Sequence, residues 1–79
     1  MRWELRLSAE AVNNLYRIER ALVPNVWLTL RALAENPNNA NLQADQDDPS
    51  IYWLAIEGDI TVKLEIVDEH HAIRVVKIN

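Results

Sequence analysis

The sequence predicts an α+β domain in which a helical hairpin packs on one face of a small, mostly antiparallel four-stranded sheet. Three observations lead to this fold class. Four short runs, one near the N-terminus and three in the last third, alternate apolar and polar residues as half-buried strands do. Two segments between them carry apolar residues at helical spacing. The elements occur in the order β-αα-βββ, and a chain of 79 residues has the size of one small domain, residues 1–79.

The first strand is predicted over residues 2–7, where every second residue is apolar: Trp3, Leu5 and Leu7. Ser8 stands where a helix N-cap belongs, and Glu10 in the first turn suits the helix dipole. The first helix is expected to run toward Pro24, because apolar residues recur at helical spacing: Ala11, Leu15, Ile18 and Leu22.

The second helix is predicted to begin at Pro24, since proline is tolerated in a first turn. It carries a broad apolar stripe and ends at Asn36-Pro37; the stripe consists of Val26, Trp27, Leu30, Leu33 and Ala34. The short connection between the helices predicts an antiparallel hairpin. Residues 36–50 are rich in Asn, Asp and Pro, so we expect an irregular and comparatively mobile connection.

Three strands are predicted in the last third, at about 51–57, 60–67 and 72–78. The middle one alternates cleanly, with Thr61, Lys63 and Glu65 on its polar face. Gly58-Asp59 fits a tight hairpin turn in which glycine supplies the positive φ. These strands form an antiparallel meander.

Composition limits the class of protein and its partners. The chain has no cysteine, which excludes disulfides and thiolate metal sites. It opens without an apolar signal region and has no apolar run of membrane-spanning length, so we expect a soluble, cytoplasmic protein. The net charge is −4, and eight of the twelve acidic residues lie between residues 45 and 69, where Lys63 is the only base. This charge distribution disfavours direct binding to duplex DNA.

The chain resembles the RelE/ParE superfamily of bacterial toxins over essentially its whole length. The resemblance depends on three features in the right order: a first strand of the form W-x-L-x-L-S, the A-L-A-E-N-P end of the second helix at residues 32–37, and the Y-W-L-A-I-E-G-D-I-T-V-K-L-E-I hairpin. It implies a cognate antitoxin as partner, and either ribosome-dependent mRNA cleavage or inhibition of DNA gyrase as activity. We expect no cofactor and no metal site.

The residues that this resemblance leads us to expect for RNA cleavage are largely missing. Ile60 and Thr61 follow the turn where an aromatic residue and an arginine are common, and Ala55 stands where a basic residue is common. Lys77 keeps one basic position in the last strand. Cleavage through a 2′-hydroxyl needs a base, an acid and a cation near the phosphate. The sequence therefore leaves open whether the protein is an enzyme.

Three residues are candidates for a catalytic role. Lys77 and Lys63 could contact phosphate, and Tyr52 could donate a phenolic proton. For each of them the sequence favours the simpler description, an ordinary strand residue with a solvated end. Asp68-Glu69-His70-His71 is expected to be a solvated hairpin corner, because adjacent strand residues point to opposite faces.

For partner binding the candidates are Arg17 and Arg20, which could receive an acidic antitoxin segment, and Trp53 if it faces outward. Trp3, Trp27 and Trp53 together could offer stacking surfaces for bases, but the flanking positive charge is missing, which favours a core or interface role. The preferred hypothesis is a toxin-like component that binds an antitoxin through the helical hairpin and a sheet edge, and inhibits translation or gyrase. The alternative is a non-toxic interaction or dimerisation module, and the sequence leaves homodimer formation open.

Overall fold

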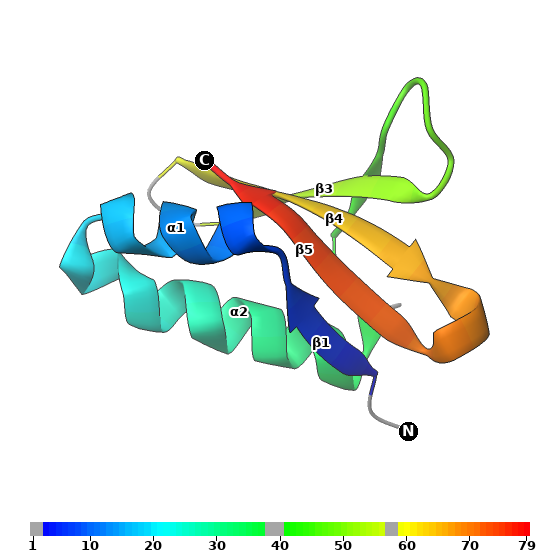
Figure 1. The fold of residues 1–79 in the computed structure, drawn as a ribbon, viewed down its shortest axis with the longest axis horizontal. Coiled ribbons are helices and arrows are strands. Elements are labelled where there is room, and N and C mark those ends of the chain that lie inside the picture. Colours follow the sequence, from blue (N-terminus) through cyan, green and yellow to red (C-terminus); the bar gives the residue numbers. More distant parts are fainter. Residues whose placement is uncertain (1–2, 38–40, 57–58) are drawn as a thin grey trace.

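The computed structural model describes residues 3–37, 41–56 and 59–79. Its elements follow the predicted order, with one additional strand and two 3₁₀ turns: β1 (Glu4–Leu7), α1 (Ala9–Arg17), a 3₁₀ turn (Arg20–Leu22), α2 (Val23–Glu35), the additional strand β2 (Gln43–Ala44), β3 (Ile51–Ile56), β4 (Ile60–Val67), a second 3₁₀ turn (Asp68–His70) and β5 (Ala72–Ile78). Figure 1 shows the two helices side by side, next to a twisted sheet in which β5 lies beside β1.

The sheet has five strands in the order β1-β5-β4-β3-β2. β1 pairs with β5 in parallel, and the other neighbours are antiparallel. The prediction of an α+β sheet with mostly antiparallel strands is confirmed, but the strand count of four was too low. β2 is a two-residue strand inside the segment expected to be irregular, and no alternation can be recognised over so short a stretch.

The core lies between the helices and one face of the sheet. Leu30 of α2, Val62 and Leu64 of β4, and Ile73 and Val75 of β5 are all 0% exposed. No polar or charged residue is buried in the described part of the chain. The hydrophobic effect of this single layer of contacts is therefore what holds the helical hairpin on the sheet.

α1 begins as predicted and ends earlier than predicted. The Ser8 hydroxyl oxygen accepts the Ala11 N–H at 3.0 Å, which is the geometry of an N-cap. The helix stops at Arg17, because Ile18 is extended with ψ 146°, and the chain then turns back through the 3₁₀ turn. Ile18 and Leu22 nevertheless pack against the core. The spacing of these apolar residues therefore correctly predicted that they are buried, but it did not show that the helix continues through them.

α2 and the turn between β3 and β4 agree with the sequence-based predictions at the residues that the structure describes. Pro24 lies in the first turn of α2, and Asn36 caps its end. Gly58, predicted to supply a positive φ, lies outside the described residues; its neighbour Asp59 has φ 63°. In the three described stretches no helix is long and apolar enough to cross a membrane.

Candidate functional site

A β-bulge in β5 decides which way Lys77 points. Leu64 pairs with Val75, but the next residue of β4, Lys63, pairs with Lys77, so Val76 is an extra residue without a partner. Strict alternation from Val75 would turn Lys77 toward the helices and Ile78 away from them. The bulge reverses this: Ile78 is 2% exposed in the core, and Lys77 reaches the sheet face that the helices leave open.

The start of α1 holds this bulge in place. The Ser8 hydroxyl donates to the Val76 carbonyl at 2.7 Å while the Ser8 N–H donates to the Val75 carbonyl at 2.9 Å. Further along α1, the Asn14 side-chain oxygen accepts the Ile78 N–H at 2.9 Å. These backbone groups of β5 thus find hydrogen-bond partners at Ser8 and Asn14, as buried polar groups require.

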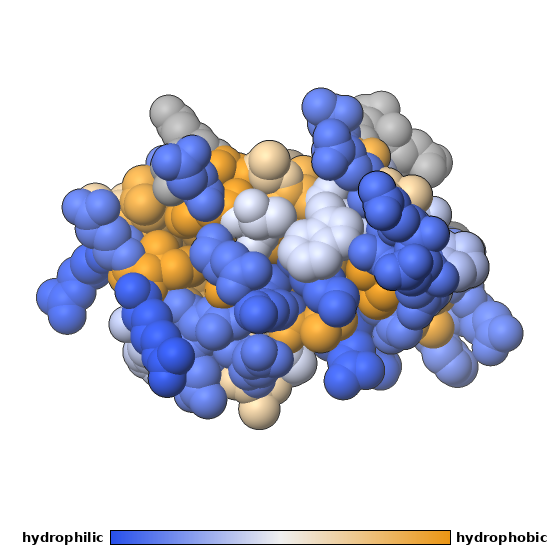
Figure 2. All heavy atoms as spheres, turned by 90° about the horizontal axis from the view of Figure 1, so that it is seen from above, coloured by the Kyte–Doolittle hydropathy of each residue, from blue (hydrophilic) through white to orange (hydrophobic). Residues whose placement is uncertain are grey.

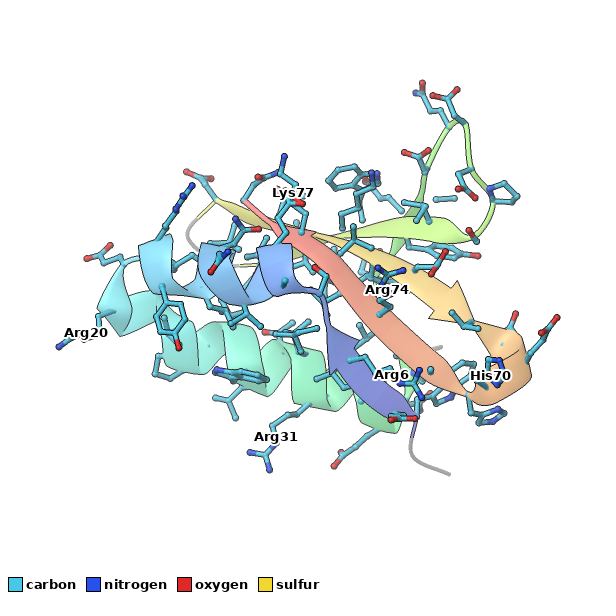
Figure 3. All side chains as sticks on the ribbon, viewed as in Figure 1. Arg6, Arg20, Arg31, His70, Arg74 and Lys77 are labelled. Carbon is cyan, nitrogen blue, oxygen red and sulfur yellow. The ribbon has the colours of Figure 1, made fainter. Side chains whose placement is uncertain are left out.

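Four basic side chains from three strands lie on the open face of the sheet, and we call them the basic row: Arg6, Arg74, Lys63 and Lys77. Arg6 is opposite Arg74 across the parallel β1–β5 pair, and Lys63 is opposite Lys77. Figure 3 shows Arg6 beside β5, with Arg74 and Lys77 further along that strand. Lys77 points upward there, toward the viewer of Figure 2, where hydrophilic side chains stand with apolar surface between them.

The two arginines of the basic row have acidic neighbours. Arg6 donates to Glu4 at 3.0 Å, and this hydrogen bond lowers the pKa of the Glu4 carboxyl and raises that of Arg6. Arg74 lies 3.9 Å from Glu65, its cross-strand partner. Both pairs are well exposed, so they contribute little to stability. Lys63 and Lys77 form no such ion pair within the described residues.

Trp53 of β3 is the aromatic neighbour of the basic row. It pairs with Lys63, whose Nζ lies 5.7 Å from the centroid of the indole ring, within the range of a cation–π contact. The indole N–H donates to the Asp45 carboxylate at 3.0 Å. That hydrogen bond is the main reason why the pKa of Asp45 is lowered, followed by the N–H of Asp47.

The structure brings together two of the three candidate catalytic residues. Lys63 and Lys77 are direct cross-strand partners on the open face. Tyr52 lies on the other face, because it alternates with Trp53, pairs with the buried Leu64 and packs against the core. The hydroxyl of Tyr52 is therefore separated from the two lysines by the sheet itself.

The histidines lie away from the basic row, at the corner between β4 and β5. The ring of His71 stacks on Trp3 with centroids 4.4 Å apart and an interplanar angle of 15°. His70 is exposed in the same corner, at the opposite end of β5 from Lys77 (Figure 3). Among the described residues, no group of three or more His, Asp or Glu side chains is placed to hold a metal ion.

A second surface feature is a groove between α1 and α2 near the end of β1. Its walls are apolar apart from Arg20; they are Leu7, Val12, Leu15, Tyr16, Ile18, Val23 and Trp27. The groove has a volume of about 530 Å³. Trp27, which the sequence placed on the buried stripe of α2, is 39% exposed here. The three tryptophans do not meet: Trp3 and Trp53 line two other cavities.

Sequence reasoning missed Arg6, Arg74 and Asp45. Arg6 alternates with the apolar residues of its strand, but nothing in the sequence shows that β1 pairs with β5. Arg74 alternates with the buried Ile73 and Val75, and this pattern alone would have placed it on the open face of the sheet. Asp45 looked like one acid of a loop and could be connected to Trp53 only through the β2–β3 pairing.

A scan against protein-family models and a comparison with curated proteins find no match to this sequence. Solved structures do match. A chain of the RelBE2 toxin–antitoxin complex of Mycobacterium tuberculosis superposes with a TM-score of 0.87 at 14% identity, over 100% of this chain and 91% of that one. The isolated Escherichia coli RelE toxin gives 0.82 at 13% identity, over 98% and 82%.

An archaeal RelE–RelB complex from Pyrococcus horikoshii gives a TM-score of 0.77 at 13% identity, over 100% of this chain and 94% of that one. The fold is therefore that of the RelE toxins, as the sequence resemblance implied. At this level of identity the likeness shows the fold.

Proposed function

We propose that this chain is the toxin-type member of a toxin–antitoxin pair and binds a cognate antitoxin. The observation that carries the proposal is a RelE fold over the whole chain, shared with proteins that were solved together with their antitoxins. In addition, the helical hairpin exposes apolar side chains and the arginines Arg17 and Arg20, which a partner segment could cover.

The open face of the sheet is the working face in this proposal. The basic row offers positive charge along three adjacent strands, and Trp53 adds a ring beside it. Such a combination suits the phosphates and bases of a single RNA strand, for which charge and stacking supply the affinity. An RNA-bearing target such as a translating ribosome therefore fits the site better than gyrase does.

Binding without cleavage is the form of activity that we favour. The described acids near the basic row are engaged, Glu4 with Arg6, Glu65 with Arg74 and Asp45 with Trp53. Tyr52 lies on the opposite face, and the histidines lie at the far end of β5. The loss of one positioned acid or base typically costs about 10²–10⁴ in rate. We accordingly expect the protein to occupy its RNA target and not to cut it.

Induced expression tests the proposal. We expect growth arrest on induction, and relief of the arrest when the neighbouring reading frame that encodes the antitoxin is co-expressed. Purified protein should inhibit in-vitro translation without new cuts in the message, and Lys63→Ala with Lys77→Ala should abolish the inhibition.

Three results would go against parts of this proposal. Absence of arrest, together with unimpaired translation and supercoiling, would leave the chain as a non-toxic interaction module on the same fold. Inhibition of gyrase with normal translation would show that the target is gyrase and not an RNA-bearing target. Cuts in ribosome-bound message that depend on Lys77 would show that the remaining groups suffice for catalysis.

A further inference from the structure

A cavity separate from the groove lies where the end of α2 meets the corner between β4 and β5. It has a volume of about 550 Å³, which is in the range of cavities that hold small ligands. In Figure 1 the end of α2, the start of β1 and this corner lie at the same end of the molecule. Tyr52 and Ile66, which line the cavity, pack against the core. The cavity is therefore on the side of the sheet that carries the helices, away from the basic row.

Two aromatic rings line this cavity, and both are held in place. The ring of Trp3 stacks on His71 with 4.4 Å between the centroids, and the Trp3 backbone N–H donates to the Ala34 carbonyl at 2.8 Å. A stacked imidazole covers only one face of an indole, which leaves part of the ring to line the cavity. Tyr52 is fixed by the β3–β4 ladder, opposite the buried Leu64. Rings of this kind attract a cation through their π-electrons.

The charge around the cavity is negative. Asp68 is the one charged residue among its described lining residues, and it forms no ion pair with another described residue. The C-terminal end of α2 is next to the cavity, since Pro37 lines it, and a helix carries a partial negative charge at this end. No basic residue lies in the last turn of α2 to compensate that charge. A positively charged ligand therefore meets a carboxylate, a helix end and two aromatic rings in one place.

The walls of the cavity favour an organic cation over a metal ion. Apart from Asp68 and Ser50 they are aromatic or aliphatic, and the Ser50 hydroxyl already donates to Asp48 at 2.7 Å. A bare metal ion needs several oxygen or nitrogen ligands, and the described His, Asp and Glu side chains form no group that supplies them. A methylated ammonium group needs no such set of ligands, and its methyl groups suit aliphatic and aromatic walls.

We propose that this cavity binds a small quaternary ammonium compound, a free molecule with a trimethylammonium head. Trp3 and Tyr52 receive the methylated head, and Asp68 together with the end of α2 compensates its charge. The inference is independent of the proposed function, because it uses neither the basic row nor the outer surface of the helical hairpin. The bound molecule joins the start of β1 to the corner between β4 and β5, so it stabilises the folded chain by its binding free energy.

The probes of the test are choline and its uncharged isostere 3,3-dimethylbutan-1-ol, which have the same shape and differ in charge. Each is titrated into the purified chain at an ionic strength that potassium chloride keeps constant, and binding is followed by calorimetry and NMR. We expect choline to bind at least about tenfold more tightly than the alcohol. The NMR shifts should include the indole N–H of Trp3 and the amides of Tyr52 and Asp68. Saturating choline should also raise the Tm.

Two pairs of variants sharpen the test. Asp68→Asn should weaken choline binding about fivefold or more and leave binding of the alcohol unchanged. Glu69→Gln is its matched control, because it removes the same charge from an exposed neighbour that does not line the cavity. Tyr52→Phe keeps the ring and should bind choline as wild type does, whereas Tyr52→Leu should lose most of the affinity. Circular dichroism confirms folding of each variant, and the first pair lies at exposed positions that the core does not need.

Several outcomes would overturn the inference. These are equal binding of choline and the alcohol, no binding at about 10 mM choline, equal losses in Asp68→Asn and Glu69→Gln, and shifts that map to Trp53 on the open face. Tighter binding of a peptide with trimethyllysine than of choline would also overturn it, since the ligand would then be a modified protein. Growth arrest by a chain that does not bind choline would leave the proposed function intact. Choline binding without any arrest would do the reverse.

Discussion

At the scale of single residues, Ser8 combines two tasks that are usually separate. Its hydroxyl oxygen accepts the Ala11 N–H and so caps α1, while its proton goes to the Val76 carbonyl at the bulge. The sequence showed the first task, because serine before an apolar-periodic segment is typical of an N-cap. It could not show the second, since the contact joins residues 68 positions apart.

We predict that Ser8→Ala lowers the free energy of unfolding by about 1–2 kcal/mol, the upper part of the range for a lost cap, because the Val76 carbonyl also loses its donor. Urea denaturation measures this. Thr29→Ala is the control: its hydroxyl donates to the Asn25 carbonyl within α2 in an exposed position. A change within about 0.5 kcal/mol is expected there. Equal effects of the two substitutions would show that the bulge contact contributes nothing.

Asp45 gives a pH-dependent prediction. Because its pKa is lowered in the folded protein, its ionised form stabilises the fold at pH values above the ordinary aspartate pKa of about 3.9. That stabilisation is lost as the pH falls through the lowered pKa. Asp45→Asn imitates the protonated form, so we expect a lower free energy of unfolding than wild type at pH 7.

The difference between wild type and Asp45→Asn should disappear as the pH falls through the lowered pKa of Asp45, because both side chains are then neutral. Urea titrations followed by tryptophan fluorescence at several pH values measure this difference. A difference that stays constant from neutral to acidic pH would mean that the charge of Asp45 is not what stabilises the contact.

At the scale of elements, β5 shows how one inserted residue changes which face of the sheet the following side chains lie on. The alternation in β5 predicted a strand, and its bounds are confirmed at residues 72–78. The bulge at Val76 was not predictable, because Val-Val-Lys-Ile fits both a regular and a bulged strand. As a result Lys77 lies opposite Lys63, and like charges directly opposite each other destabilise a sheet.

We predict that Lys77→Glu raises the free energy of unfolding by up to about 1 kcal/mol while it abolishes RNA binding. The substitution replaces the repulsion between Lys63 and Lys77 by an attraction, and it removes a cation from the basic row. Chemical denaturation and a filter-binding assay with single-stranded RNA give the two readouts.

Arg74→Glu is the matched control, with the same change in net charge. Arg74 faces both Glu65, at 3.9 Å, and Arg6, so the lost attraction to Glu65 offsets the relief of repulsion with Arg6, and we expect no net stabilisation. A stability gain from Lys77→Glu alone is the expected result. If Lys77→Glu also gave no stabilisation, the two lysines would not be repelling each other.

The helices show where periodicity is informative and where it is not. The apolar stripe of α2 identified its buried residues, apart from Trp27 at the groove. In α1 the same pattern extended beyond the helix, because Ile18 and Leu22 pack on the core from non-helical backbone. Periodicity describes burial, so it locates the buried side more reliably than the last helical residue.

At the scale of the whole molecule, the sequence predicted the fold class and the order of elements because each local pattern is consistent with the global fold. It did not predict the sheet order beyond the meander. The parallel pairing of β1 with β5 joins Glu4 to Ala72, residues at opposite ends of the chain, and no local pattern encodes such a contact. The basic row depends on this pairing. Its four side chains are far apart in the sequence, so the sequence did not predict that they lie together on one face.

The position of β5 in the sheet determines when the sheet can fold during synthesis of the chain. β5 is the last strand of the chain but lies inside the sheet, between β1 and β4. Until it is synthesised, β1 has no strand to pair with, and the contacts from α1 to Val76 and Ile78 cannot form. A ribosome thus carries the preceding strands in an unassembled form until β5 has been synthesised. The open face with its complete basic row comes into existence only then, because two of its four side chains, Arg74 and Lys77, belong to β5.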